Sequence, residues 1–200
     1  MHAVRKAALF LSLVAAMWSV LPGAANAAEP IKAGSITSSP PFISYESDGK
    51  TLHGIIVDLA AAMSKHMGRE IVFEQMPFSG LLPALQAGRI DAIFSIMNDT
   101  PARQKLVDFV DFFNMGSTLL IRAGNPDHVV GMDASFCGKT VATVRGSLQI
   151  AIAEKASAQC TSAGKQAIKI NQYATPAEGR LQVQTGNAAG FFGNTPILAY

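Results

Sequence analysis

Apolar and polar residues follow two different spacings along this chain, and the two spacings alternate. Short runs rich in β-branched and aromatic residues predict strands at residues 31–35, 71–73, 91–96, 115–122, 140–144, 167–171 and 188–192. Apolar residues three and four positions apart predict helices at residues 55–67, 80–87, 148–159 and 176–185. Strands separated by helices are typical of parallel βαβ units, so the pattern predicts an α/β fold.

The predicted helix at residues 55–67 shows the helical spacing clearly. Its apolar positions Ile55, Leu59, Met63 and Met67 share one face on a helical projection. Gly68 follows the last of them and is expected to end the helix in a left-handed conformation.

A break at residues 123–126 divides the pattern into two halves, each with its own strands and helices. We expect a first lobe at residues 28–122 and a second lobe at residues 123–200, with a cleft between them. Ligands of open α/β sheets bind beyond the carboxyl ends of the strands. The binding site is therefore expected at the loops that begin near residues 36, 96, 145 and 193.

The first 27 residues have the pattern of a secretory signal peptide. Arg5 and Lys6 precede an apolar run at residues 7–21, and Ala25 and Ala27 form a small-residue cleavage site. A membrane anchor is the alternative, but the run is short for a span of roughly 20 residues. We expect cleavage after Ala27 and export of the chain to the periplasm.

Charge gives no sign of a polyanionic partner. The chain has 16 basic and 14 acidic residues, and removing Arg5 and Lys6 leaves 14 of each. A chain without net charge or a basic stripe is a poor candidate for binding nucleic acid or an anionic membrane surface.

The two cysteines, Cys137 and Cys160, both lie beyond the signal sequence. Exported proteins meet an oxidising compartment, so a disulfide between the two is expected. Neither cysteine has a second cysteine or a histidine at the spacing of zinc ligands, so no metal site is predicted. No cofactor is predicted either.

The segment SIMNDTPARQKLVDF, residues 95–109, carries the candidate chemistry. Thr100 suits the N-cap of a helix and Pro101 its first position, which makes Arg103 the third residue. The helix dipole disfavours a cation there unless an anion binds beside it. A carboxylate would receive the guanidinium fork and backbone donors together. The alternative is a surface arginine whose stem lies over Leu106.

Short polar residues stand near this arginine and at a second turn. Ser95 and Asn98 precede the predicted helix and supply donors and acceptors, although both residue types are also common in turns. Gly146 and Ser147 follow the strand at 140–144, where glycine permits close backbone approach and serine suits an N-cap. The second turn would meet the same anion from the other lobe, or it is an ordinary strand-to-helix turn.

Four ordered motifs resemble the solute-binding protein family 3 of ABC transporters, the periplasmic polar-amino-acid-binding proteins. They are GIIVDL at 54–59, LPALQAGRIDA at 82–92, DTPAR at 99–103 with DF at 108–109, and FCGKTV at 136–141 with RGS at 145–147. The resemblance implies a two-lobed, type II periplasmic-binding-protein-like fold that closes on its ligand. It also implies that Arg103 grips the ligand carboxylate, helped by Ser95, Asn98, Thr100, Gly146 and Ser147.

The sequence departs from the family pattern at the positions that would hold the rest of a ligand. Ile36 and Ser39 stand at the acidic and aromatic positions of the first loop, and Ile56 replaces an acidic residue. Asn194 stands where the family has an acidic residue for the ligand ammonium. An asparagine offers an oxygen without charge, so recognition of an α-amine is in doubt. Phe78 and Phe42 are expected either to stack on the ligand or to belong to the core.

The resemblance implies a monomeric binding protein that delivers a small carboxylate, with an amino acid as the first candidate, to a permease in the inner membrane. Family members continue beyond the position of Tyr200, so we expect an incomplete second lobe. An enzyme on the same scaffold, a dehydratase or lyase, is the alternative, but the expected cleft positions supply no titratable group. A receptor sensor domain is a third possibility.

Overall fold

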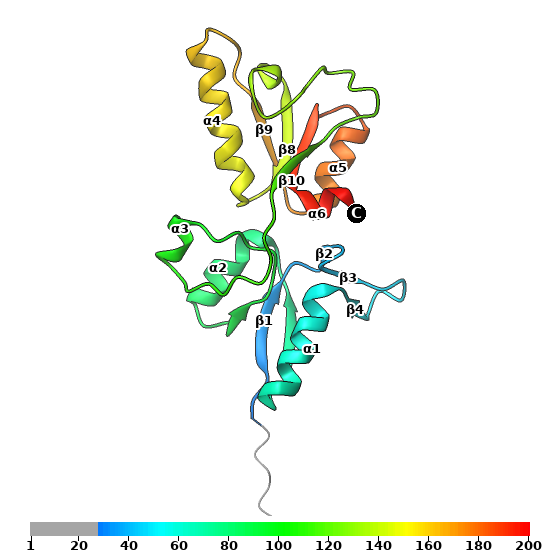
Figure 1. Ribbon diagram of the computed structural model, residues 1–200, viewed down its shortest axis with the longest axis vertical. Coiled ribbons are helices and arrows are strands. Elements are labelled where there is room, and N and C mark those ends of the chain that lie inside the picture. The colour runs from blue at the N-terminus through cyan, green and yellow to red at the C-terminus, as the bar shows by residue number, and fades with distance from the viewer. Residues whose placement is uncertain (1–27) are drawn as a thin grey trace, which may run out of the picture.

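The computed structural model describes residues 28–200, which form two lobes (Figure 1). The predicted signal peptide lies outside the described residues. Strands β1 to β6 and helices α1 to α3 make the first lobe, at the bottom of the figure. Strands β7 to β10 and helices α4 to α6 make the second lobe above it. In the described part of the chain, every helix is too short or too polar to cross a membrane.

A three-stranded parallel sheet forms the centre of the first lobe. Strand β1 (Ile31–Ser35) lies in the middle, with β5 (Ile71–Gln75) on one side and β6 (Ala92–Ile93) on the other. Helices α1 (Ile55–Met67) and α2 (Phe78–Gln86) connect these strands. Strand β6 is shorter than the predicted strand at 91–96, because its pairing with β1 is limited to Ala92 and Ile93.

Helix α1 has the predicted bounds, but its most buried face is not the one that carries Ile55, Met63 and Met67. Gly68 ends the helix in the left-handed region, with φ of 62°, as expected. The fully buried residues are Ile56 and Ala60, whereas Ile55 is 42% exposed and Met67 is 47% exposed. The helix is apolar almost all round, so hydrophobic spacing alone could not choose the packed face.

A small antiparallel sheet in the first lobe was not predicted. Strands β2 (Ser38–Ser39), β3 (Ile43–Tyr45) and β4 (Leu52–His53) pair in the order β2-β3-β4. Residues 40–42 connect β2 to β3, and residues 46–51 connect β3 to β4. Strands of two or three residues are too short to produce a recognisable alternation.

The second lobe contains a mixed sheet in the order β7-β10-β8-β9. Strand β8 (Thr140–Val144) pairs in parallel with β9 (Lys169–Tyr173) and with β10 (Gly190–Asn194). Strand β7 (Ser117–Leu120) pairs antiparallel with β10. The remaining elements are η1 (Ala134–Phe136) and the helices α4 (Leu148–Ser162), α5 (Pro176–Gln184) and α6 (Thr195–Ala199). The α/β prediction is confirmed.

The passage between the lobes comes earlier than the expected boundary at residue 122. Because β7 forms hydrogen bonds with β10, the chain has already joined the second sheet at Ser117. The break at residues 123–126 is instead a turn within the second lobe, with Asn125 and Gly124 at positive φ. The turn residues were recognised correctly, but a turn does not reveal which sheet the strand before it joins.

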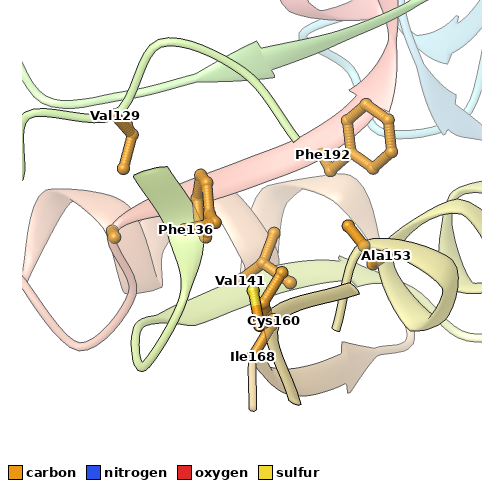
Figure 2. Packing of buried hydrophobic residues seen from close by; sticks show 9 residues of the cluster. Val129, Phe136, Val141, Ala153, Cys160, Ile168 and Phe192 are labelled. Atoms are coloured by element: carbon orange, nitrogen blue, oxygen red, sulfur yellow. The ribbon is translucent and has the colours of Figure 1, made fainter. Parts of the chain in front are cut away.

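The second lobe is held together by a buried cluster under α4, and Figure 2 shows part of it. Phe136, Val141 and Phe192 of this cluster come from η1, β8 and β10. Cys160 of α4 lies among them and forms a disulfide with Cys137, which confirms the predicted pair. The bridge ties the helix to the segment that leads into β8.

Gly179 makes a testable packing contact in α5. A Cβ atom there would lie 2.5 Å from Cδ2 of Phe191, whose side chain is buried. We expect Gly179→Ala to destabilise the protein by roughly 1–3 kcal/mol, because overpacking outweighs the helix propensity of alanine. Gly80→Ala in α2 is the matched control, because a Cβ there meets nothing within 4 Å. It should stabilise by about 0.5–1 kcal/mol. Urea unfolding of both variants measures the difference, and equal midpoints would contradict this packing.

Candidate functional site

Arg103 lies at the start of α3 (Pro101–Gln104), on the loop that follows β6. Thr100 is the N-cap, and its side-chain oxygen accepts a hydrogen bond from the Arg103 backbone N–H at 3.3 Å. Pro101 occupies the first helical position. The local structure predicted around Arg103 is therefore confirmed. Because α3 has only four residues, few aligned peptide dipoles act at its N-terminus.

The Arg103 guanidinium bridges the two lobes. Its Nη1 donates a hydrogen bond to the carbonyl oxygen of Asn98 at 2.7 Å, within the first lobe. Its Nη2 donates to the carbonyl oxygen of Gly146 at 3.0 Å, in the second lobe. The guanidinium carbon also lies 5.5 Å from the ring centroid of Phe78, within cation–π range. A guanidinium has five N–H donors, so three remain for a ligand.

No carboxylate of residues 28–200 neutralises this cation. Ion pairs in that range join Arg122 to Asp127 and His53 to Glu46, and neither includes Arg103. Burial lowers the pKa of Arg103 from its usual value, yet an arginine stays protonated at neutral pH. A partly buried cation without an ionic partner favours the binding of an anion.

The turn at Gly146 places the second lobe against Arg103. Gly146 has φ of 77°, a conformation that L side chains rarely adopt, and its carbonyl accepts from Arg103. Ser147 is the N-cap residue of α4 by position, but its side chain makes no capping hydrogen bond. Its Oγ instead lies 3.1 Å from Oγ1 of Thr143. The predicted N-cap position is confirmed, and the predicted capping by the side chain is wrong.

A small cavity lies between the lobes at this place, with a volume of about 30 Å³. Of the predicted site residues it is lined by Phe78, Asn98, Ser147 and Asn194. Apolar residues of both lobes complete the wall, among them Ile36, Ile96 and Ile197. A single buried water already needs at least about 10–15 Å³. A cavity of this volume is therefore far too small for an amino acid.

Ser95 does not line this cavity. It lies in a larger hollow of about 1000 Å³, along the edge of β6, together with Asn98 and Asp99. Its side chain is 5% exposed, and its Oγ has no hydrogen-bond partner among residues 28–200. Thr100 acts as the helix cap and lines neither space. Phe42 is fully buried and packs edge-to-face on Phe113, so it belongs to the core.

Gln149 is a cleft residue that the sequence analysis missed. It lines the cavity, is 2% exposed, and its Nε2 donates to Oγ of Ser117 and to Oδ1 of Asn194, both at 2.8 Å. The signal was present in the sequence. Gln149 shares one face of α4 with the buried residues Ala153, Ala156 and Cys160. A polar residue on a buried face usually has a hydrogen-bond partner, so its position indicates a polar contact.

In a comparison with protein families, residues 31–189 match the bacterial extracellular solute-binding proteins, family 3. This match spans most of the chain. The chain belongs to that family. The family 3 assignment agrees with the resemblance that the four sequence motifs indicate.

Named relatives of this family 3 protein bind arginine or histidine. It is 32% identical to the arginine-binding protein ArgT of Corynebacterium glutamicum over 85% of this chain and 55% of that protein. It is 34% identical to the histidine-binding periplasmic protein of Salmonella typhimurium over 73% of this chain and 55% of that protein. The chain therefore spans about half the length of these relatives.

Solved structures give the same answer for the fold. An ancestral arginine-binding protein bound to arginine matches 86% of this chain and 73% of its own with a TM-score of 0.78 and 27% identity. The prediction of a two-lobed, type II periplasmic-binding-protein-like fold is confirmed at this level. The family 3 protein is thus a relative of amino-acid-binding proteins in both sequence and structure.

Proposed function

We propose that this chain is the substrate-binding component of an ABC transporter and that it captures a small carboxylate between its two lobes. The carrying observation is the Arg103 guanidinium, a partly buried cation without an ionic partner that contacts both lobes beside a cavity. A carboxylate fits the planar fork of a guanidinium and satisfies the charge that burial leaves uncompensated.

Lobe movement explains how a ligand enters. A cavity of about 30 Å³ admits no amino acid, so the lobes separate before binding and close afterwards. The hydrogen bond from Arg103 to Gly146 and the packing of Ile197 against Ile36 and Ile96 hold the lobes together. A bound carboxylate takes guanidinium donors from the first lobe and meets the turn at Gly146 and Ser147 from the second. The ligand thereby favours the closed state over the open one.

Membership of family 3 supports delivery of the ligand to a permease in the inner membrane. The relatives include proteins named as periplasmic, which supports export to the periplasm and action there. We propose that the closed, ligand-bound form acts as a monomer and docks on the permease. Ser95, Asn98, Thr100, Gly146, Ser147, Asn194 and Phe78 remain the proposed ligand-binding residues beside Arg103. Amino acids are the first ligands to test, because relatives are named for arginine and histidine.

The alternative of an enzyme on the same scaffold has less support. General acid–base chemistry needs a titratable group within reach of the substrate. None of the residues that line the cavity in the described part of the chain is acidic, histidine, lysine or cysteine. Arg103 can bind and orient a carboxylate, but its high pKa makes it a poor base.

Thermal unfolding with added ligands tests the proposal. A ligand present at 100 times its Kd stabilises by about 2.7 kcal/mol, which raises Tm by roughly 5–10 °C in a domain of this size. We expect such a rise with at least one amino acid, oxo acid or hydroxy acid. The corresponding carboxamide, which lacks the carboxylate, is the control and should give none. The absence of a rise for every carboxylate would contradict the proposed function.

A further inference from the structure

The polar part of the cavity wall carries no negative charge. Asn98, Ser147, Gln149 and Asn194 are its polar side chains, and all of them are neutral. The Arg103 guanidinium brings a positive charge beside this wall through its hydrogen bond to the Asn98 carbonyl. A ligand ammonium placed here would lose its hydration and meet a cation with no compensating carboxylate.

Gln149 also engages the oxygen that a ligand amine would need. Its two Nε2 hydrogens are directed at Ser117 and at Oδ1 of Asn194. Asn194 then offers a ligand its Nδ2–H₂ donors and the second lone pair of an oxygen that carries no charge. Rotating both amides by 180° would exchange donor and acceptor, but it would leave the pair without charge. In neither orientation does Asn194 supply a counter-ion for an ammonium.

An acidic side chain next to the cavity-lining Asn98 lies on another surface. Asp99 lines the larger hollow beside β6 and does not line the cavity. One of its oxygens, Oδ2, accepts from Gln104 at 2.8 Å, and the other is buried without a partner among residues 28–200. Asp99 is therefore a group whose role an experiment must separate from that of Asn194.

We infer that the cleft selects carboxylates that lack a positively charged amine, with Gln149 holding Asn194 as a neutral partner. The ligand class is a 2-oxo or 2-hydroxy acid with an apolar side group. Its carboxylate pairs with Arg103, and its oxo or hydroxyl oxygen accepts from Asn194. Its side group contacts Phe78, Ile36 and Ile96, which line the same cavity. This inference rests on the proposed function of carboxylate capture.

Calorimetric titration of the exported chain with matched ligand pairs tests the inference. Leucine is compared with 4-methyl-2-oxopentanoate and with 2-hydroxy-4-methylpentanoate, and phenylalanine with phenylpyruvate and phenyllactate. We expect an oxo or hydroxy acid to bind at least tenfold more tightly than its amino acid. Equal or tighter binding of the amino acid would overturn the inference while leaving the proposed function intact. Failure of every carboxylate to bind would overturn both.

Variants assign the preference to the Gln149–Asn194 pair. Asn194→Asp places a carboxylate at the cavity and should shift the ratio of the two affinities at least tenfold toward the amino acid. Gln149→Leu frees the Asn194 amide and should bring the ratio closer to one. Gln159→Glu adds the same charge on an exposed part of α4 and should leave the ratio unchanged. An Asn194→Asp protein that folds and keeps the parent ratio would contradict the assignment.

Asp99→Asn tests whether Asp99, rather than Asn194, accepts a ligand ammonium. If an amino acid binds best to the parent and Asp99→Asn removes that advantage, Asp99 is the ammonium acceptor and the inference is wrong. If the oxo or hydroxy acid binds best and Asp99→Asn leaves the ratio unchanged, the neutral pair alone sets the preference.

Discussion

Replacing Arg103 with alanine should reduce carboxylate binding by roughly 30-fold to several thousand-fold. Removing one partner of a buried, hydrogen-bonded charge pair costs about 2–5 kcal/mol, and about 1.4 kcal/mol corresponds to a factor of ten. The variant loses the charge, the guanidinium fork and the stacking on Phe78. Calorimetric titration with the ligand found in the thermal screen measures the loss.

Two further arginine variants make the result specific. Arg103→Lys keeps a positive charge but loses the planar fork, so its affinity should lie between those of the parent and Arg103→Ala. Arg145→Ala removes an exposed arginine from the loop that contains Gly146 and should change affinity by less than about threefold. Binding by a folded Arg103→Ala protein as tight as that of the parent would show that the carboxylate is held elsewhere.

The double variant Cys137→Ala with Cys160→Ala should be less stable than the oxidised parent by roughly 3 kcal/mol. The bridge joins residues separated by 23 positions, and in the loop-entropy model a loop of this size contributes about that much. For a domain of 150–250 residues this corresponds to a fall in Tm of about 6–12 °C. Thermal unfolding of the two proteins measures the difference.

Reduction provides the control for the disulfide. A reducing agent should lower the Tm of the parent to near that of the double variant and should leave the variant unchanged. The effect belongs to the second lobe, because both cysteines pack in or against the cluster that contains Phe136 and Val141. A double variant that melts within about 1 °C of the oxidised parent would contradict the prediction.

Local signals in the sequence were strong enough to predict much of this fold. The bounds of α1, the strand β8 and the cap at Thr100 followed from apolar spacing and from residues with specific roles at helix ends. These features depend on residues within a few positions of one another. The disulfide was predictable for a different reason, because the chain is predicted to be exported and its two cysteines have one pairing within the chain.

Features that depend on distant partners were not predictable from one sequence. Strand β7 joins the second sheet through its antiparallel pairing with β10, which lies some 70 positions later. The two- and three-residue strands β2, β3 and β4 exist because they pair with one another. The spacing of apolar residues along one sequence does not indicate which distant strands pair.

The candidate site also has local features that the sequence predicted and distant contacts that it did not. The position of Arg103 at a helix start was readable, but its bond to Gly146, 43 positions away, required the two lobes to be placed. The hydrogen bond from Gln149 to Asn194 spans 45 positions and could not be predicted from the sequence pattern. The sequence indicated a neutral residue at Asn194, and the structure added the neighbour that fixes it.

The Arg103 guanidinium can be observed directly by nuclear magnetic resonance. Its side-chain Nε–Hε signal, assigned by its loss in Arg103→Lys, should shift when a binding carboxylate is added. The shift should saturate at the same ligand concentration as calorimetric binding, and the carboxamide should cause none. Saturable carboxylate binding that leaves the Arg103 signal unmoved would contradict the claim that this arginine anchors the ligand.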